Sequence, residues 1–348
     1  MQLPTIRVYF TDFWDGFNPK GSRFWSVLSK RYNVVLESKH PEIVFFSCFG
    51  ARHLQFDCVK VYYTGENIAP DFNLCDYAIG FHHIDFDDRY LCSPGFDAEH
   101  VCEAGTVARQ QAIAGDPIQK EFCNFIYSNP AADPIRDTFF QVLSTRKHVD
   151  SLGRHLRNKK GTAAERNEGG WVASKLEMQR DYNFTIAFEN SETPGYTTEK
   201  IAHAFLSGTI PIYWGDPRIA DDFNPKAFIH VRDFATLEDC ANYVVEVSED
   251  IERISGYLSE PIFRNGVVPE HLRREVFDGF LYSICDQPAD QRARRPRSGG
   301  HANHYIATLK REQRIPNLKY VATSKGKRVL RRFSFRKIRK LWAKLIAK

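Results

Sequence analysis

Short apolar runs alternate with amphipathic stretches along the first part of the chain. The runs are rich in Val, Ile, Phe and Tyr, and we expect each of them to form a β-strand. They occupy residues 6–10, 33–36, 43–46, 59–63 and 77–80. Residues 22–31 have apolar positions at helical spacing and predict an amphipathic helix. Strands separated by helical stretches are typical of a doubly wound α/β unit with mostly parallel strands.

The same alternation begins again after a loosely patterned stretch between residues 90 and 120. We predict strands at 122–127, 183–188 and 209–214, and helices at 134–145 and about 197–207. Residues 154–181 are polar and contain glycine, which predicts mostly loop with some helix. We therefore expect an α/β protein with two Rossmann-like domains that face a central cleft.

Domain limits follow from these patterns and from a change of composition near the end. We place the first domain at residues 1–117 and the second at 118–285. From residue 286 the chain is rich in Gln, Arg, Pro and Gly, and we interpret 286–348 as a mobile linker followed by a tail.

Composition narrows the class of protein. The chain has 348 residues, 43% of them hydrophobic, and no apolar run long enough for a transmembrane helix. Its N-terminus lacks the pattern of a secretory signal peptide. The eight cysteines form no CxxC pair, which argues against a zinc site and a disulfide scaffold and favours buried thiols in a reducing cytoplasm.

The basic charge is concentrated in the tail. Residues 328–348 contain nine Lys or Arg and no acid, so the rest of the chain has a net charge of −4 against +5 for the whole. Phe335, Ile338, Trp342 and Leu345 fall on one helical face. This pattern favours an amphipathic helix on an anionic membrane surface. A solvated disordered tail is one alternative. Nucleic-acid binding is a weaker alternative, because no known nucleic-acid-binding fold accompanies the tail.

The segment FENSETPGYTTEK, residues 188–200, places many polar groups at the carboxyl end of a predicted core strand. Open α/β sheets bind ligands at this end of their strands, and the following helix N-terminus suits phosphate. Lys200 lies in the first turn of that helix, where a cation is unfavourable unless an anion compensates for it. We therefore predict a bound anion that Lys200 contacts. The alternative is that Lys200 points outward beside Glu199.

Other polar residues of these loops fit a nucleotide. Glu189, Asn190 and Glu199 offer acceptors for ribose hydroxyls, and Tyr196 offers a ring and a hydroxyl.

Arg136 follows the turn Ser128-Asn129-Pro130, and a guanidinium there suits a diphosphate. Ser128 and Asn129 are included in the predicted donor site, whereas a surface arginine is the alternative for Arg136. Asp85 and Asp87 spell a D-x-D sequence, but any acidic turn produces one, and we predict no metal site.

The segment FENSETPGYTTEKIAHAFLSGTIPIYWGDP, residues 188–217, resembles the signature of the inverting α1,3/α1,4-fucosyltransferases that use GDP-fucose. Residues 61–91, 122–144, 149–154 and 219–231 resemble family segments in the same order, so the resemblance covers about residues 5–285. It implies a GT-B fold in which the first domain binds the acceptor and the second binds GDP-fucose.

The resemblance also implies roles for individual residues. Arg136 and Lys200 match the family's phosphate-binding arginine and lysine, and Asn190, Tyr196 and Glu199 match ribose- and guanosine-side contacts. Glu66, in the segment TGEN, matches the proposed general base; without the resemblance it is an ordinary turn carboxylate. Inverting transfer needs one such carboxylate to take the acceptor proton. The two cations take the role of a metal, so no cofactor is expected.

These features predict transfer of L-fucose from GDP-fucose to the GlcNAc 3-hydroxyl of N-acetyllactosamine-type glycans. We expect the protein to act on lipopolysaccharide or similar glycans, in the cytoplasm at the inner face of a bacterial membrane. The alternatives are a transferase of the same fold with another nucleotide sugar or an α1,4 linkage, and a non-catalytic glycan- or membrane-binding protein. The full set of Glu66, Arg136, Glu199 and Lys200 argues against the last, because a binding protein has no need of the base.

Overall fold

The computed structural model describes residues 3–115, 117–160, 170–296 and 300–312. Residues 1–295 belong to one compact unit, and the chain from residue 296 belongs to a second. The predicted membrane-binding tail, residues 328–348, lies outside the described residues.

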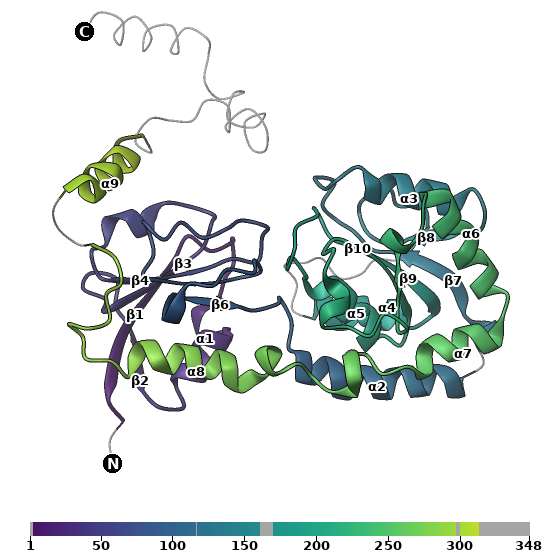
Figure 1. Ribbon diagram of the computed structural model, residues 1–348, viewed down its shortest axis with the longest axis horizontal. Coiled ribbons are helices and arrows are strands. Elements are labelled where there is room, and N and C mark those ends of the chain that lie inside the picture. The colour runs from purple at the N-terminus through teal and green to yellow at the C-terminus, as the bar shows by residue number, and fades with distance from the viewer. Residues whose placement is uncertain (1–2, 116, 161–169, 297–299, 313–348) are drawn as a thin grey trace, which may run out of the picture. The chain divides into compact units, whose positions relative to one another are not determined.

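The first sheet is entirely parallel, with the strand order β2-β1-β3-β4-β5-β6 (Figure 1). All five predicted strands are confirmed, and β6 is an additional strand that is too short to show a periodic pattern. The strands are β1 (Thr5–Thr11), β2 (Asn33–Leu36), β3 (Ile43–Phe46), β4 (Val59–Tyr63), β5 (Tyr77–Gly80) and β6 (Tyr90–Cys92).

The second sheet is also parallel, with the order β11-β10-β9-β7-β8. Its strands are β7 (Glu121–Phe125), β8 (Val149–Ser151), β9 (Tyr182–Phe188), β10 (Ile210–Trp214) and β11 (Ile229–His230). All seven residues of the central strand β9 are buried. A parallel strand that is covered on both faces has a continuous apolar sequence, which explains why the three strands predicted here are confirmed.

Helices cover both sheets, and short 3₁₀ turns connect several elements. The α-helices are α1 (Arg23–Leu28), α2 (Ala98–Ala114), α3 (Ile135–Ser144), α4 (Trp171–Gln179), α5 (Glu199–Leu206), α6 (Leu237–Ser248), α7 (Ile251–Ser259), α8 (Arg274–Cys285) and α9 (Gly300–Glu312). The 3₁₀ turns are Pro19–Gly21, Arg52–Gln55, Asp87–Arg89, Pro117–Gln119, Ile219–Asp221, Val231–Asp233, Arg264–Gly266 and Glu270–Leu272.

The long helix α2 occupies the stretch that we interpreted as loosely patterned, so that interpretation is wrong. Its buried positions include Ala98, Gly105, Arg109 and Ala112, which do not form a recognisable apolar stripe. The helix contacts α5 and α7, and a Cβ atom on Gly105 would lie 2.8 Å from Ile262 Cδ1. Small residues allow this close approach, but they hide the helical periodicity.

The chain returns to the first sheet after the second is complete. Phe277 and Leu281 of α8 belong to the same hydrophobic core as Ile6 and Val8, and Figure 1 shows α8 beside α1. The hydroxyl of Tyr282 donates to the carbonyl of Val27 at 3.0 Å. The predicted extension of the second domain to residue 285 therefore has to be corrected, because α8 completes the first domain.

The predicted mobile linker also begins too early, because residues 286–295 are held on the first domain. The carboxylate of Asp76 is fully buried and accepts from the backbone N–H groups of Arg294 and Arg295 at 2.9 and 3.0 Å. It also accepts from the guanidinium of Arg295 at 3.0 Å. A buried carboxylate requires such partners, and the polar sequence of this stretch supplies them.

The described residues of the second unit are Pro296 and helix α9, and α9 has no buried residue. Across the described residues, none of the helices combines the length and apolar character needed to cross a membrane.

Candidate active site

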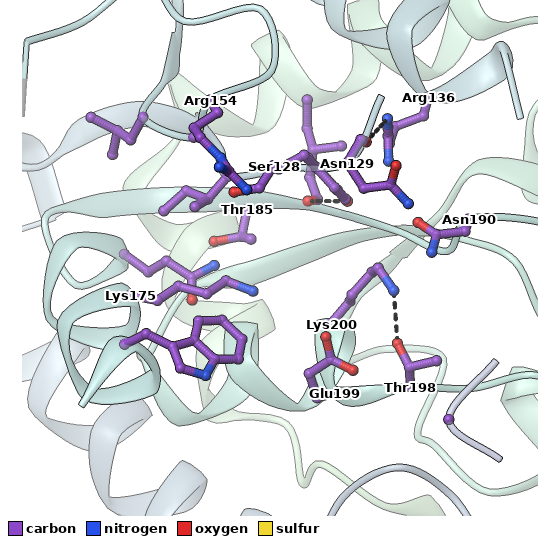
Figure 2. Close-up of a pocket in the computed structure, with 18 of the residues that line it drawn as sticks. Ser128, Asn129, Arg136, Arg154, Lys175, Thr185, Asn190, Thr198, Glu199 and Lys200 are labelled. Atoms are coloured by element: carbon purple, nitrogen blue, oxygen red, sulfur yellow. Dashed lines mark hydrogen bonds between the residues drawn. The ribbon is translucent and has the colours of Figure 1, made fainter. Parts of the chain in front are cut away.

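A cavity of about 510 Å³ lies where strands of both sheets reach their carboxyl ends. Its walls come from the turn after β4, the ends of β7 and β8, helices α3, α4 and α5, and the loop after β9 (Figure 2). The polar and aromatic side chains in these walls are Glu66, Tyr127, Ser128, Asn129, Arg136, Arg154, Arg157, Trp171, Lys175, Gln179, Thr185, Asn190, Tyr196, Thr198, Glu199 and Lys200.

The cavity brings together all but one of the residues that the sequence predicted for the site. Those that line it are Glu66, Ser128, Asn129, Arg136, Asn190, Tyr196, Glu199 and Lys200. Parallel strands that end at one edge of a sheet place their following loops side by side, which explains this convergence.

Glu189 is the exception, and its predicted contact with a ribose hydroxyl does not fit its position. The side chain has no exposed surface. One carboxylate oxygen accepts from the Thr198 backbone N–H at 2.7 Å, and the other accepts from the Thr198 hydroxyl at 2.7 Å and from Lys200 Nζ at 2.8 Å. Glu189 therefore stabilises the loop and the lysine from beneath the cavity wall.

This ion pair also explains the unfavourable cation in the first turn of α5. Burial lowers the pKa of Lys200, but the charges of Glu189 and Glu199 outweigh burial and raise it well above its usual range. The compensating anion is therefore part of the protein, and Lys200 does not point outward as the alternative supposed. Its side chain keeps 13% of its surface exposed and lines the cavity.

The backbone at Gly215 makes room for Glu189. A Cβ atom at this glycine would lie 2.5 Å from Glu189 Cγ. A side chain at this position would therefore push against the carboxylate that holds Lys200.

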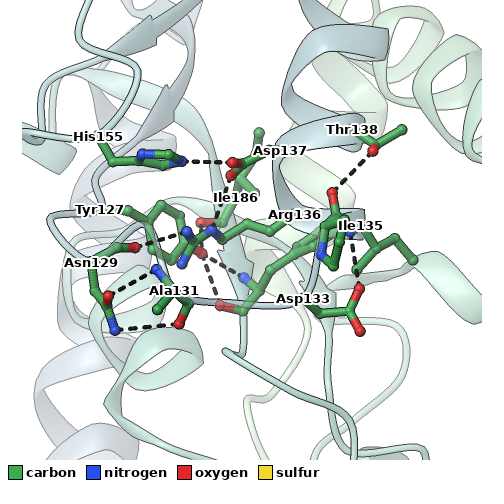
Figure 3. Close-up of polar contacts among 12 residues, drawn as sticks. Tyr127, Asn129, Ala131, Asp133, Ile135, Arg136, Asp137, Thr138, His155 and Ile186 are labelled. Atoms are coloured by element: carbon green, nitrogen blue, oxygen red, sulfur yellow. Dashed lines mark hydrogen bonds and ion pairs between the residues drawn. The ribbon is translucent and has the colours of Figure 1, made fainter. Parts of the chain in front are cut away.

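Arg136 is 1% exposed, so the alternative of a surface arginine is wrong. Figure 3 shows its guanidinium between the turn after β7 and the first turn of α3. Nη2 donates to the carbonyl of Asn129 at 2.8 Å, and Nε lies 3.4 Å from a carboxylate oxygen of Asp137. Nη1 is buried and has no hydrogen-bond partner among the described residues. A buried guanidinium donor without an acceptor at a cavity wall is suited to an anionic ligand.

A second set of contacts fixes the surroundings of Arg136. The other carboxylate oxygen of Asp137 lies 2.7 Å from His155 Nε2 (Figure 3). The Asp133 backbone N–H donates to the carbonyl of Asn190 at 2.8 Å. The start of α3 is thereby connected to the segment after β8 and to the loop after β9.

Sequence reasoning missed the residues that α4 and the segment after β8 contribute. Trp171, Lys175 and Gln179 lie four residues apart on α4 and line the cavity, as do Arg154 and Arg157. Figure 2 shows Lys175 at one end of the cavity and Arg136 at the other. The four-residue spacing was a detectable helical signal, but it lay in a polar stretch that we interpreted as mostly loop.

The charges around the cavity favour an anion. Its lining contains five cationic side chains, Arg136, Arg154, Arg157, Lys175 and Lys200, and two carboxylates, Glu66 and Glu199.

The pKa of Glu199 reflects this cationic surrounding. Burial raises it, but the charges of Lys200, Lys175 and His203 together lower it to about 2. Burial and then the charge of Lys175 lower the pKa of His203 to about 3, so the imidazole is neutral at pH 7. The positive charge of the wall therefore comes from the lysines and arginines, which suits a diphosphate.

Glu66 approaches the cavity from the first sheet. Its backbone N–H donates to the Thr64 hydroxyl at 2.9 Å. The side-chain amide of Asn67 donates to the hydroxyls of Ser191 and Thr193 at 2.7 and 2.8 Å. The turn that carries Glu66 is therefore attached to the loop after β9. A carboxylate from one sheet and cations from the other line one cavity.

The described residues contain no group of three or more His, Cys, Asp or Glu side chains that could hold a metal ion.

Family models match both halves of the chain. Residues 8–98 match the N-terminal domain of the α-(1,3)-fucosyltransferase FucT, and residues 117–274 match the C-terminal region of glycosyltransferase family 10 (fucosyltransferase).

Solved structures agree with these matches. A crystal structure of an α1,3-fucosyltransferase with GDP-fucose is 29% identical and has a TM-score of 0.68, over 82% of this chain and 92% of that chain. A structure of an α1,3-fucosyltransferase with GDP has a TM-score of 0.69, over 84% and 94%. The two parallel sheets and the cavity at their carboxyl ends thus define a glycosyltransferase fold of the GT-B type. The chain belongs to glycosyltransferase family 10.

Several curated relatives are similar to the chain over part of their length. The Helicobacter pylori α-(1,3)-fucosyltransferase FucT is 33% identical over 69% of this chain. The human 3-galactosyl-N-acetylglucosaminide 4-alpha-L-fucosyltransferase FUT3 is 33% identical over 39% of it, and human GDP-fucose protein O-fucosyltransferase 3 is 30% identical over 40%. The chain covers 57% of the H. pylori protein and 36% and 30% of the two human proteins.

Proposed function

We propose that this protein transfers L-fucose from GDP-fucose to the 3-hydroxyl of GlcNAc in N-acetyllactosamine-type glycans, with inversion at the anomeric carbon. One observation carries the proposal: Glu66 lines the same cavity as Arg136 and Lys200. A base on one side and diphosphate-binding cations on the other are what an inverting displacement requires.

The donor diphosphate binds at the cationic end of the cavity. Arg136 Nη1 is a buried donor without a partner among the described residues, and Lys200 Nζ is exposed enough to contact a ligand while Glu189 holds it. Both groups donate to phosphate oxygens. As the bond between the sugar and GDP breaks, negative charge grows on the β-phosphate, and the two cations stabilise it.

Glu66 acts from the opposite side of the sugar. Its carboxylate takes the proton of the acceptor hydroxyl while that oxygen attacks the anomeric carbon and GDP leaves from the other face. Because Arg136 and Lys200 supply the positive charge, the reaction proceeds without a divalent metal or other cofactor. Incubation with EDTA should leave the rate of transfer unchanged, and a loss that Mg²⁺ or Mn²⁺ restores would contradict this.

The names of similar proteins support the proposed α1,3 linkage. The similar Helicobacter pylori protein is an α-(1,3)-fucosyltransferase, and two solved structures titled α1,3-fucosyltransferase share the fold. The match to a human 4-alpha-L-fucosyltransferase favours an α1,4 linkage as the second candidate. Lewis-type glycans of a lipopolysaccharide are the acceptors that we infer for the first candidate.

We also infer that the tail holds the enzyme at an anionic membrane. Residues 328–348 carry nine basic residues and no acid, together with Phe335, Ile338, Trp342 and Leu345 at helical spacing. Two such signals, charge and an apolar face, suit peripheral binding at the cytoplasmic side of a bacterial membrane, where lipid-linked glycans are available.

Release of GDP from GDP-fucose tests the proposal. The purified chain should release GDP with N-acetyllactosamine, and NMR of the product should show fucose on the GlcNAc 3-hydroxyl. Lacto-N-biose serves as the matched acceptor, since its GlcNAc offers the 4-hydroxyl instead. Turnover only with lacto-N-biose would favour the α1,4 candidate. No release of UDP is expected when UDP-galactose replaces GDP-fucose as the donor. Absence of turnover with both acceptors would contradict the proposal.

A further inference from the structure

Aromatic side chains are exposed at the carboxyl ends of β1 and β3. Trp14 is 44% exposed and Phe49 is 49% exposed, and their ring centroids lie 6.5 Å apart in an edge-on arrangement. The Trp14 ring also meets Phe17 edge-on at 5.0 Å, and Phe17 stacks on Phe13 at 4.0 Å. We call Phe13, Trp14, Phe17 and Phe49 the aromatic platform. Two large exposed rings side by side suggest a binding surface.

The platform and Glu66 share one edge of the first sheet. In the parallel register Thr11 pairs with Phe46 and Phe46 pairs with Tyr62, so the segments after β1, β3 and β4 leave the same edge of the sheet. Glu66 follows β4 at this edge. The platform therefore lies on the edge of the first sheet that carries the proposed base.

The platform also packs against the end of β4. Phe13 stacks on Tyr63 with centroids 6.2 Å apart. Tyr63 is the last residue of β4, and Glu66 lies in the turn that follows it, so the platform packs against the end of the strand that leads to the proposed base.

The loops that carry the platform are held rigidly. Asp12 has a φ angle of 60°, a left-handed conformation that is uncommon outside glycine. Its carboxylate accepts from the backbone N–H groups of Arg52 and His53 at 2.9 and 2.8 Å, and its carbonyl accepts from the Phe49 N–H at 3.0 Å. A Cβ atom on Gly50 would lie 2.5 Å from Asp12 Oδ1. The two loops are thus fixed to each other, and the exposed rings have a defined separation.

We propose that Trp14, with Phe49 beside it, binds a sugar ring of the acceptor glycan. A pyranose has an apolar face of C–H groups, which packs on an indole ring, and a rim of hydroxyls that remains in water. Because Glu66 is placed at the reacting hydroxyl, the ring on Trp14 belongs to a part of the acceptor that does not react. This inference rests on the proposed function and extends it by naming an acceptor subsite.

Trp14→Ala tests this subsite, with Trp14→Phe as the conservative variant. Contacts made equally in the ground state and the transition state affect KM and leave kcat unchanged. Trp14→Ala should therefore raise KM for N-acetyllactosamine-containing oligosaccharides about tenfold, with kcat and GDP affinity close to wild type. Trp14→Phe should recover most of the loss. Val107→Ala, at an exposed apolar position on α2, is the control and should match wild type.

Binding of N-acetyllactosamine measured by saturation-transfer NMR separates this inference from the proposed function. If wild type binds the glycan without transferring fucose, and Trp14→Ala loses binding, the subsite stands and the proposed function falls. If wild type transfers fucose and Trp14→Ala has an unchanged KM for the glycan, the proposed subsite is wrong. Equal glycan binding by both proteins, or none by wild type, also overturns it.

Discussion

Lys200 Nζ lies 2.8 Å from a carboxylate oxygen of Glu189, a side chain with no exposed surface. The cation that we assign to the donor phosphates is therefore fixed by a residue that the ligand does not reach. The same carboxylate holds the backbone and hydroxyl of Thr198, so one buried group organises the start of α5.

Glu189→Ala should strongly destabilise the protein. It leaves the ammonium group of Lys200 without its buried partner, and breaking a buried ion pair in this way costs about 3–5 kcal/mol. The free energy of unfolding from urea titration measures the loss. Glu192→Ala, in the same loop, is the control. Glu192 forms an ion pair with Arg232, and the two side chains are 32% and 46% exposed, respectively. Loss of this exposed pair should cost at most about 1 kcal/mol. Equal losses in the two variants would contradict the role of Glu189.

Lys200→Ala should weaken the binding of GDP and GDP-fucose. A hydrogen bond to a charged group contributes about 1.5–3 kcal/mol, so we expect a loss of roughly ten- to a hundredfold in affinity by calorimetry. Lys226→Ala, at an exposed lysine of the same domain, is the control. Unchanged GDP affinity in Lys200→Ala would remove this residue from the donor site, even if the variant were less stable.

Glu66→Gln should abolish transfer and leave donor binding almost intact. The substitution keeps the size of the side chain and removes the base, and loss of a general base lowers the rate about 10²–10⁴-fold. The measurements are kcat from GDP release and the Kd of GDP from calorimetry. Glu121→Gln changes a side chain that is 62% exposed and should behave like wild type. Retained turnover in Glu66→Gln would exclude this residue as the base.

His203 should make stability depend on pH. Burial and the charge of Lys175 lower its pKa in the folded protein to about 3, below the ordinary value of 6.5. The unfolded chain therefore binds the proton first, and stability is lost as the pH falls from about 6.5 toward 3. The free energy of unfolding, measured at pH 7.5, 6.5 and 5.5, should fall less steeply in His203→Gln than in wild type. The difference between the two slopes should be at most about 1.4 kcal/mol per pH unit.

A matched variant controls for other groups that titrate in this range. His148→Gln replaces an imidazole that is 74% exposed, and its pH profile should follow wild type. If His203→Gln also followed wild type, the imidazole would not contribute to the acid sensitivity.

Deletion of residues 328–348 should release the protein from anionic vesicles. Each basic residue near such a surface contributes about 1 kcal/mol to binding, and nine are removed. Co-sedimentation with phosphatidylglycerol vesicles measures this, and neutral phosphatidylcholine vesicles are the control. Activity on a soluble acceptor should be unchanged, because the proposed site lies before residue 201. Full retention on anionic vesicles would contradict the role of the tail.

Much of the fold was predictable because parallel strands are buried on both faces. Strands β3, β5 and β9 are buried at every position, and their continuous apolar sequences made them recognisable. Helix α2 was not recognisable, because its buried positions are largely small residues and Arg109. The packing of α8 against the first sheet was also not predictable, because the local sequence of a helix does not determine which sheet it covers.

The sequence by itself determined the parallel α/β architecture, and the resemblance that it carries assigned Glu66, Arg136 and Lys200 to one site. Local composition and chain order suffice for this, because loops after parallel strands meet at one edge. Only the tertiary structure decided that Glu189 is a buried counterion, that α4 contributes Lys175, and that Trp14 lies beside Phe49. These relationships depend on strand order and on burial, which set distances between segments that are far apart in the chain.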